Sequence, residues 1–460
     1  MNCPGQIRTL TRRAALGLAS NGFGWVAFSS MQAQAAGPHH AARAKNVILL
    51  FMPGGVSHME SFDPKPKLEE LDGKPARLDN YVAGPNRKWL RCLWKFRRYG
   101  QCGAPVSDLF PHIARHVDKL AIVRSMKSSF PLHARGNIFL HTGRNVGGYP
   151  SLGSWITYGL GSENRNLPGY VLLRDAYVPP GGIENFSNGF LPATHQATHI
   201  RDEGQPVDHI VPADHDARVQ RAKLDALLEQ DRWFAAGRRG GDAVESAIAN
   251  YEMAYRMQSL VPDVLNLGRE PAATRRMYGL ESTDRAQAAY GLQCLRARRL
   301  VESGVRFVEV TCPNLFGQNG TWDQHSGLKN DHERNAFVTD QAIGALLTDL
   351  EQRGMLDETL VIWAGEFGRT PDSGNGDGRD HHPFCFTIWM AGGGVKGGVT
   401  YGETDELGNE VVRDPVSIHD FHATVLHLLG LDHTRLTYRF GGREQRLTDV
   451  HGQVIAGIVA

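Results

Sequence analysis

The sequence carries almost no net charge, few cysteines and, after residue 45, no long apolar run. Its 50 lysines and arginines nearly balance 49 aspartates and glutamates, which leaves a formal charge of +1. General electrostatic attraction to nucleic acid or to an acidic membrane therefore has no basis in this chain. We expect no transmembrane anchor in the mature protein, because a spanning helix needs about 20 apolar residues in a row. No low-complexity or solenoid-length repeat is present, which excludes fibrous and repeat architectures.

None of the six cysteines lies in a Cys-x-x-Cys pair, so we expect neither a thiolate zinc site nor a dithiol redox site. Removal of an N-terminal leader would take Cys3 and leave an odd number, so at least one thiol stays free or pairs between chains. The remaining composition, with 41% hydrophobic and 22% charged residues, is that of an ordinary globular protein. A length of 460 residues allows one large α/β domain or two to three smaller ones.

Residues 1–36 have the features of an export signal. Arg12 and Arg13 precede a weakly apolar stretch that runs to Phe28, and residues 33–35 offer a small-residue cleavage pattern. The weak hydrophobicity favours the twin-arginine route. We therefore expect the twin-arginine export machinery as a partner and a periplasmic or secreted protein. A disordered basic leader is the alternative interpretation.

Apolar runs alternate with helical patterns along the rest of the chain. Residues 46–52 are apolar on both faces and end at Pro53 and two glycines, which is typical of a buried parallel strand. Further strands are predicted at 120–123, 171–173, 306–311, 359–364 and 384–390, and helices at 284–303, 334–353 and 416–429. This alternation predicts an α/β protein, a three-layer α/β/α sandwich on a mainly parallel sheet. We expect one domain over 46–460, with a helical insertion at about 214–304 that is interrupted at 237–241.

Four polar clusters follow the predicted strands. Since ligand sites in open α/β sheets lie at the carboxyl ends of the strands, these clusters are expected to meet. Carboxylates and imidazoles without thiols suit divalent ions from zinc to manganese and magnesium. Each cluster alone is also consistent with a capped turn, an ion pair or a solvated loop, but together they predict a metal site. The candidate ligands are Asp323, His325, Glu366, Asp380, His381 and His382.

The order of these motifs resembles an exported bacterial family, DUF1501. The resemblance runs from about residue 46 to the C-terminus. Its motifs are Gly54-Gly55-x-Ser57-His58, Trp322-Asp323-x-His325, Glu366-Phe367-Gly368-Arg369-Thr370-Pro371 and Gly378-Arg379-Asp380-His381-His382-Pro383. That family is similar in plan to the alkaline phosphatase and sulfatase superfamily, which implies an alkaline-phosphatase-like fold. The resemblance also implies one or two divalent ions, zinc or manganese, that act with Arg369 on a phosphoryl or sulfuryl group.

The resemblance assigns the ligands one by one. Asp323 and His325 stand where one Asp/His pair of the superfamily stands. Glu366 replaces the Asp of a second pair, and His381 or His382 matches the last His ligand.

The departures from the superfamily concern the nucleophile and the first strand. The strand ends in Pro53-Gly54-Gly55 instead of a metal-binding Asp, with Glu60 or Asp63 as substitutes. Aligning Thr142-Gly143-Arg144 places His133 where the sulfatases carry a Cys or Ser nucleophile, so a formylglycine mechanism has no Cys to start from. The nucleophile stays open between His133, as nucleophile or metal ligand, and several serines. The candidate catalytic residues are His133, Ser57, His58 and Arg369, with Ser128 and Ser129 as further hydroxyls.

Two functions follow. The first is an exported, metal-dependent hydrolase of phosphate or sulfate esters, with a small-molecule or glycan substrate. The second is a non-catalytic binding protein on the same fold that recognises an anionic glycan or ester. The missing Asp after the first strand and the missing hydroxyl or thiol nucleophile favour the second; the convergent ligand clusters favour the first.

Overall fold

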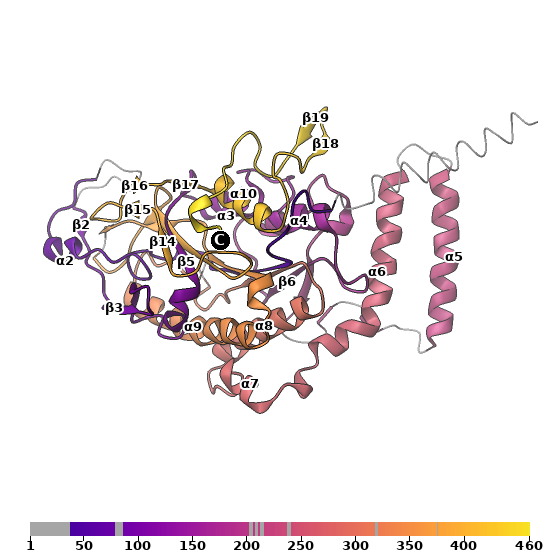
Figure 1. Ribbon diagram of the computed structural model, residues 1–460, viewed down its shortest axis with the longest axis horizontal. Coiled ribbons are helices and arrows are strands. Elements are labelled where there is room, and N and C mark those ends of the chain that lie inside the picture. The colour runs from indigo at the N-terminus through magenta and orange to yellow at the C-terminus, as the bar shows by residue number, and fades with distance from the viewer. Residues whose placement is uncertain are drawn as a thin grey trace, which may run out of the picture. The chain divides into compact units, whose positions relative to one another are not determined.

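A nine-stranded sheet forms the centre of the protein in the computed structural model (Figure 1). The structure describes residues 37–78, 86–201, 206–207, 210–211, 216–236, 241–317, 321–374 and 376–460, so the predicted signal at 1–36 lies outside the described residues. The strands follow the order β14-β5-β13-β9-β1-β8-β6-β7, and β17 also pairs with β5. Their bounds are β1 Asn46–Phe51, β5 Leu120–Lys127, β6 Tyr170–Arg174, β7 Thr198–Arg201, β8 Phe307–Thr311, β9 Thr359–Ala364, β13 Phe386–Ala391, β14 Val399–Tyr401 and β17 Val416–Ser417.

The sheet is mainly parallel, as the sequence predicts. Strands β7, β6, β8, β1 and β9 pair in parallel, and β14 and β17 pair in parallel with β5. Strand β13 runs antiparallel to both of its neighbours, β9 and β5, so β5 points the same way as β9. The carboxyl ends of β1, β5, β8 and β9 therefore lie at one edge of the sheet.

Helices cover both faces of the sheet because β1 is apolar on both faces. Ile48 and Leu50 contribute to one hydrophobic cluster, together with helices α8 and α9. Val47 and Phe51 contribute to the other, together with helices α3, α4 and α10. The three-layer α/β/α arrangement is thus confirmed. The helix bounds are α3 His133–Thr142, α4 Leu152–Leu160, α8 Arg285–Glu302, α9 Leu328–Gln352 and α10 Ile418–Leu428.

The region predicted as a helical insertion contains helices of two kinds. Helices α5 (Ala217–Ala236) and α6 (Gly241–Leu265) lie side by side (Figure 1), joined by an ion pair between Arg221 and Glu252 at 2.7 Å. Helix α7 (Ala272–Met277) follows. Helix α8 differs, because its Cys294 and Leu295 are fully buried in the cluster under the sheet. Among the described residues, no helix is both long and apolar enough to cross a membrane.

Short elements complete the fold and build part of the site. Two short strands within the polar loop after β9, β10 and β12, pair antiparallel, with Arg369 opposite His381. The short helices and strands are α2 Lys67–Leu71, β2 Lys88–Trp89, β3 Phe96–Tyr99, β4 Ala104–Ser107, β10 Gly368–Arg369, β11 Asp372–Ser373, β12 His381–His382, β15 Glu403–Thr404, β16 Val411–Arg413, β18 Tyr438–Phe440 and β19 Arg443–Gln445. The 3-10 turns are η1 Ile113–Lys119, η2 Gly182–Phe186, η3 Ala193–His195, η4 Leu267–Arg269, η5 Leu356–Glu358 and η6 Ala456–Ile458.

Candidate metal centre

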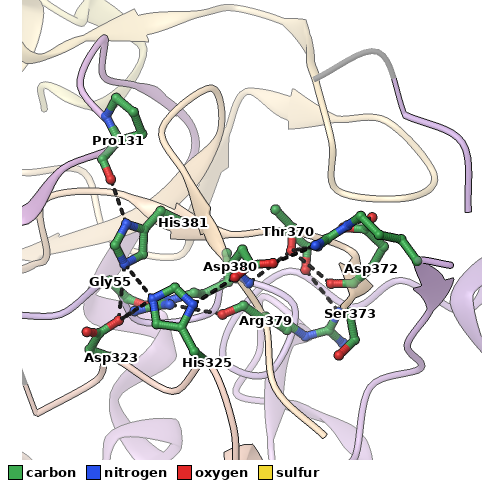
Figure 2. Close-up of polar contacts among 12 residues, drawn as sticks. Gly55, Pro131, Asp323, His325, Thr370, Asp372, Ser373, Arg379, Asp380 and His381 are labelled. Carbon is green, nitrogen blue, oxygen red and sulfur yellow. Dashed lines mark hydrogen bonds and ion pairs between the residues drawn. The ribbon is translucent and has the colours of Figure 1, made fainter. Parts of the chain in front are cut away.

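Side chains from three separate parts of the chain meet at the carboxyl edge of the sheet. His133 is the first residue of α3, which follows β5, and Asp323 lies in the loop after β8. His381 comes from the short strand β12, in the loop between β9 and β13. Figure 2 shows His381 directed at Asp323, with His325 beside them. Because β5, β8 and β9 end at the same edge, Asp323 becomes a neighbour of His381, 58 positions away, and of His133, which lies far earlier in the chain.

The ligand atoms of His133, Asp323 and His381, which we call the triad, all lie within 4.8 Å of one another. The Oδ2 atom of Asp323 is 3.2 Å from Nε2 of His133, and its Oδ1 atom is 3.1 Å from Nε2 of His381. His133 and Asp323 are buried, with 6% and 7% of their surface exposed. Two imidazole nitrogens and a carboxylate oxygen this close together suit a divalent ion, which binds such atoms at about 2.0–2.2 Å.

Both imidazoles of the triad are oriented through their other ring nitrogen. Nδ1 of His133 lies 2.6 Å from Oε1 of Glu366, and Nδ1 of His381 lies 2.6 Å from the carbonyl oxygen of Pro131. Metal-binding histidines usually donate this second N–H to a carboxylate or a carbonyl. Nε2 of His133 is buried beside the carboxylate of Asp323. Once its proton is lost, this nitrogen can bind a cation.

Glu366 lies behind His133 and outside the triad. Its carboxylate accepts the backbone N–H of Gly54 at 2.9 and 3.1 Å, in addition to the bond with His133, and it is fully buried. The sequence predicts Glu366 as a metal ligand. In the structure its carboxylate contacts Nδ1 of His133 and the backbone of Gly54.

His325 and Asp380 lie on the solvent side of the triad. Nε2 of His325 is 3.1 Å from Oδ1 of Asp323 and 3.0 Å from Nε2 of His381. Its Nδ1 atom is 2.7 Å from Oδ1 of Asp380, whose other oxygen accepts from Arg87 at 2.7 Å. His325 is 46% exposed. It is therefore adjacent to the triad, and Asp380 orients it.

The charges of the site shift several protonation equilibria. Hydrogen bonds to Asp323 and Asp380 raise the pKa of His325 to about 9. Bonds from His325 and Arg87 lower the pKa of Asp380 to about 2, against the effect of burial. Burial alone would raise the pKa of Asp323, but the three histidines and Arg369 hold it well below its usual range. Burial lowers the pKa of His381 to about 4. These shifts favour an anionic Asp323 and a neutral His381, the forms that bind a cation.

Burial also acts on His133, where it lowers the pKa. The hydrogen bonds to Asp323 and Glu366 outweigh it, so the pKa of His133 is raised. Glu366 faces Nδ1 and Asp323 faces Nε2. The proton on Nε2 would have to leave before that atom binds a metal.

Three predicted residues lie elsewhere. Ser57 is fully buried and its hydroxyl donates to Glu60, while Nε2 of His58 lies 2.9 Å from the carbonyl oxygen of Gly408. Nε2 of His382 lies 2.7 Å from the carbonyl oxygen of Asn409. Successive residues of a strand point to opposite sides, so His381 reaches the triad and His382 turns away. None of the three has a hydrogen bond or ion pair to the triad within the described ranges.

Arg369 reaches Asp323 but not the solvent. Its side chain is fully buried, and Nη2 donates to Oδ1 of Asp323 at 2.8 Å. Its other acceptors are the backbone oxygens of Gly54, Gly55, Trp322 and Arg379. The resemblance implies that Arg369 offsets charge on a substrate. In the structure its charged contact is with Asp323.

Some residues of the site have no signal in the sequence. Pro131 contributes a backbone carbonyl, which any residue type has. Arg87 is 8% exposed and binds Asp372 and Asp380. Phe367 packs its ring against His133 and His381, at 5.0 and 4.8 Å between ring centres. Of these, only Phe367 could have been found, because it lies inside a motif.

The comparison with protein families covers nearly all of the chain. The model described as "Protein of unknown function (DUF1501)" matches residues 44–459. The chain belongs to the DUF1501 family. The predicted membership is therefore confirmed. No curated protein matches the sequence.

Solved structures similar to this DUF1501 protein include phosphatase- and sulfatase-type enzymes. The lipoteichoic acid synthase LtaP from Listeria monocytogenes is 10% identical, with a TM-score of 0.38, over 92% of this chain and 78% of that one. A protein of the alkaline phosphatase superfamily from Vibrio parahaemolyticus is 9% identical, with a TM-score of 0.40, over 86% and 69%. The PsFucS1 sulfatase from Pseudoalteromonas sp. is 12% identical, with a TM-score of 0.36, over 90% and 72%. At TM-scores below 0.5 these likenesses support no conclusion about activity.

Proposed function

We propose that this DUF1501 protein is an exported, metal-dependent hydrolase of phosphate or sulfate esters, either small molecules or glycans. The triad of His133, Asp323 and His381, with an orienting partner behind each imidazole, is the observation that carries the proposal. Export through the twin-arginine machinery and a periplasmic or secreted location are part of the proposal. They rest on residues 1–36, which lie outside the described residues.

The chain's own residues would hold one divalent ion, zinc or manganese. His133, Asp323 and His381 would bind it, and His325 lies close enough to join them from the solvent side. When bound, such an ion polarises an ester oxygen and lowers the pKa of water. Glu366 keeps the proton of His133 on Nδ1, and the carbonyl of Pro131 does the same for His381. Nε2 of each ring then faces the site, and Nε2 of His133 becomes a ligand once its proton has left.

The attacking oxygen is assigned to water in this proposal. His133 uses its Nε2 atom as a ligand, so the same atom is not available as a nucleophile. The hydroxyl of Ser57 is bonded to Glu60, and the backbone N–H of Ser128 bonds Pro383. Neither serine hydrogen-bonds to the triad. A direct attack by water needs no covalent intermediate on the chain.

Metal analysis of the mature protein tests the proposal. Protein purified without added metal is expected to carry near-stoichiometric zinc or manganese, and His381→Ala is expected to lose it. His382→Ala is a matched control, because it removes the neighbouring imidazole, which bonds Asn409 and not the triad. Turnover of aryl phosphates or aryl sulfates should stop on chelation and return with metal. Full turnover in the chelated protein would refute metal-dependent hydrolysis.

A binding protein is the second candidate. The observation in its favour concerns two candidate nucleophiles in the described part of the chain: Ser57 is buried against Glu60, and neither Ser57 nor Ser128 hydrogen-bonds to the triad. This function predicts saturable binding of a sulfated or phosphorylated ligand to the metal-loaded protein with no product released. Any metal-dependent turnover of the ester panel would exclude it.

A further inference from the structure

We infer that the site holds a single divalent ion. The guanidinium of Arg369 supplies the second positive charge of the site, and it lies among oxygen atoms beside Asp323. The inference rests on the proposed metal centre and concerns how many ions it takes. It also gives Arg369 a role that differs from contact with a substrate.

Both oxygens of Asp323 contact histidines of the triad. Oδ2 is 3.2 Å from Nε2 of His133, and Oδ1 is 3.1 Å from Nε2 of His381. Oδ1 also accepts from Nη2 of Arg369 at 2.8 Å. Two ions that share a carboxylate in catalytic sites lie about 3.5–4 Å apart. A second ion bound to Oδ1 would therefore compete with the guanidinium that already bonds this oxygen.

The oxygen atoms that surround Nη2 of Arg369 are of the kind that bind metal cations. Besides Oδ1 of Asp323, the acceptors around this nitrogen are the carbonyl oxygens of Trp322, at 3.1 Å, and of Gly54. Carbonyl and carboxylate oxygens are the ligands that hard divalent ions prefer. Here the same oxygens bind a guanidinium that is always charged.

The turn directly after β1, residues 53–55, has no carboxylate that could bind a second ion. Gly54 and Gly55 have φ of 111° and 78°, and a Cβ atom on Gly54 would lie 2.7 Å from the backbone nitrogen of Asp323. The turn contributes backbone oxygens to Arg369 and a backbone N–H to Glu366. Close packing therefore keeps the end of β1 free of a carboxylate.

Charge supports the same stoichiometry. Asp323 and Glu366 are the two carboxylates in contact with the triad imidazoles, and Arg369 offsets one of them. One divalent ion then leaves this group with a small positive charge, which suits an anionic ester. A second divalent ion would lie beside a guanidinium, and the further carboxylate at the site, Asp380, already pairs with Arg87 and His325. Such an excess of positive charge is unfavourable in a buried site.

The test is metal stoichiometry in the intact mature protein. The chain is incubated with excess Mn²⁺, desalted, and examined by native mass spectrometry and by electron paramagnetic resonance. We expect one ion per chain and the six-line signal of an isolated Mn²⁺. Two ions per chain with an exchange-coupled signal would overturn the inference while leaving the metal centre in place. No bound ion would overturn the proposed function instead.

Variants at position 369 test whether the guanidinium is what excludes a second ion. Arg369→Gln, confirmed as folded by circular dichroism, should bind a second Mn²⁺, because it removes the charge and exposes the oxygens around Nη2. Arg369→Lys keeps a positive charge there and should stay at one. If folded Arg369→Gln also binds one ion, the guanidinium does not exclude the second, and the inference is overturned. If Arg369→Gln does not fold, the wild-type stoichiometry and its Mn²⁺ signal decide the question.

Discussion

Replacing Glu366 with glutamine tests whether the residue behind His133 sets the metal affinity. Glu366 contacts Nδ1 of His133 at 2.6 Å and is held by two bonds from the backbone N–H of Gly54. Glutamine has nearly the same shape and keeps one oxygen for Gly54. It loses the negative charge, so it no longer makes His133 a stronger ligand. If the amide nitrogen faces Nδ1, two donors oppose each other and the ring is pushed from its position.

The expected loss follows from comparable sites. Changing the partner of a metal-binding histidine typically weakens metal affinity 10- to 100-fold, which is roughly 1.4–2.7 kcal/mol of binding free energy. We expect Glu366→Gln to stay folded and to bind Zn²⁺ more weakly by about this factor. The dissociation constant is measured by competition with a chromophoric chelator at constant pH.

Glu309 supplies a matched control for this measurement. It is another fully buried glutamate bound to a histidine, His141, at 3.0 Å, and it also accepts from Tyr170 at 2.9 Å. Glu309→Gln should lower the unfolding free energy by about 1–3 kcal/mol, as expected when a buried bond is disrupted, without changing the Zn²⁺ affinity. Unchanged affinity in Glu366→Gln, or an equal loss in both variants, would refute the assigned role of Glu366.

Three further predictions concern stability. Gly54→Ala should lose metal and melt at a lower temperature in thermal scans. Left-handed strain costs about 1–3 kcal/mol, and the added Cβ would lie 2.7 Å from the backbone of Asp323. An unchanged melting temperature would contradict this packing. Chelation should lower the melting temperature of the wild type but not of His381→Ala. An ion at 100 times its dissociation constant raises the free energy of unfolding by about 2.7 kcal/mol. Equal shifts in the two proteins would contradict the ligand role of His381. Burial raises the pKa of Asp340 from 3.8 to about 7, so its contribution to stability falls as pH rises through this interval. The free energy of unfolding of Asp340→Asn, measured with urea, should therefore rise relative to that of the wild type from pH 4 to pH 7. A difference that does not change with pH would refute this.

The layered fold could be predicted because its signals are local. The apolar run at 46–52 is buried on both faces as β1, and the strands predicted at 306–311 and 359–364 are its neighbours β8 and β9. Helix α3 had no such signal, since its sequence contains Gly136 and Asn137, which have low helix propensity. Packing explains it: a Cβ atom on Gly136 would lie 3.2 Å from Glu366. The helix forms where a small residue lets it approach the site.

The sequence by itself determined the chemical types and the general location of the site. Carboxylates and imidazoles at the ends of parallel strands indicate a metal, and Asp323 and His381 are in the triad. Tertiary structure alone decided between His381 and His382, because neighbouring residues of a strand carry the same local signal and differ only in the side they face. It also placed His133 in the triad with Glu366 behind it, and buried Arg369 against Asp323. These contacts join atoms that are 233 and 46 residues apart in the chain, and no local pattern encodes such a meeting.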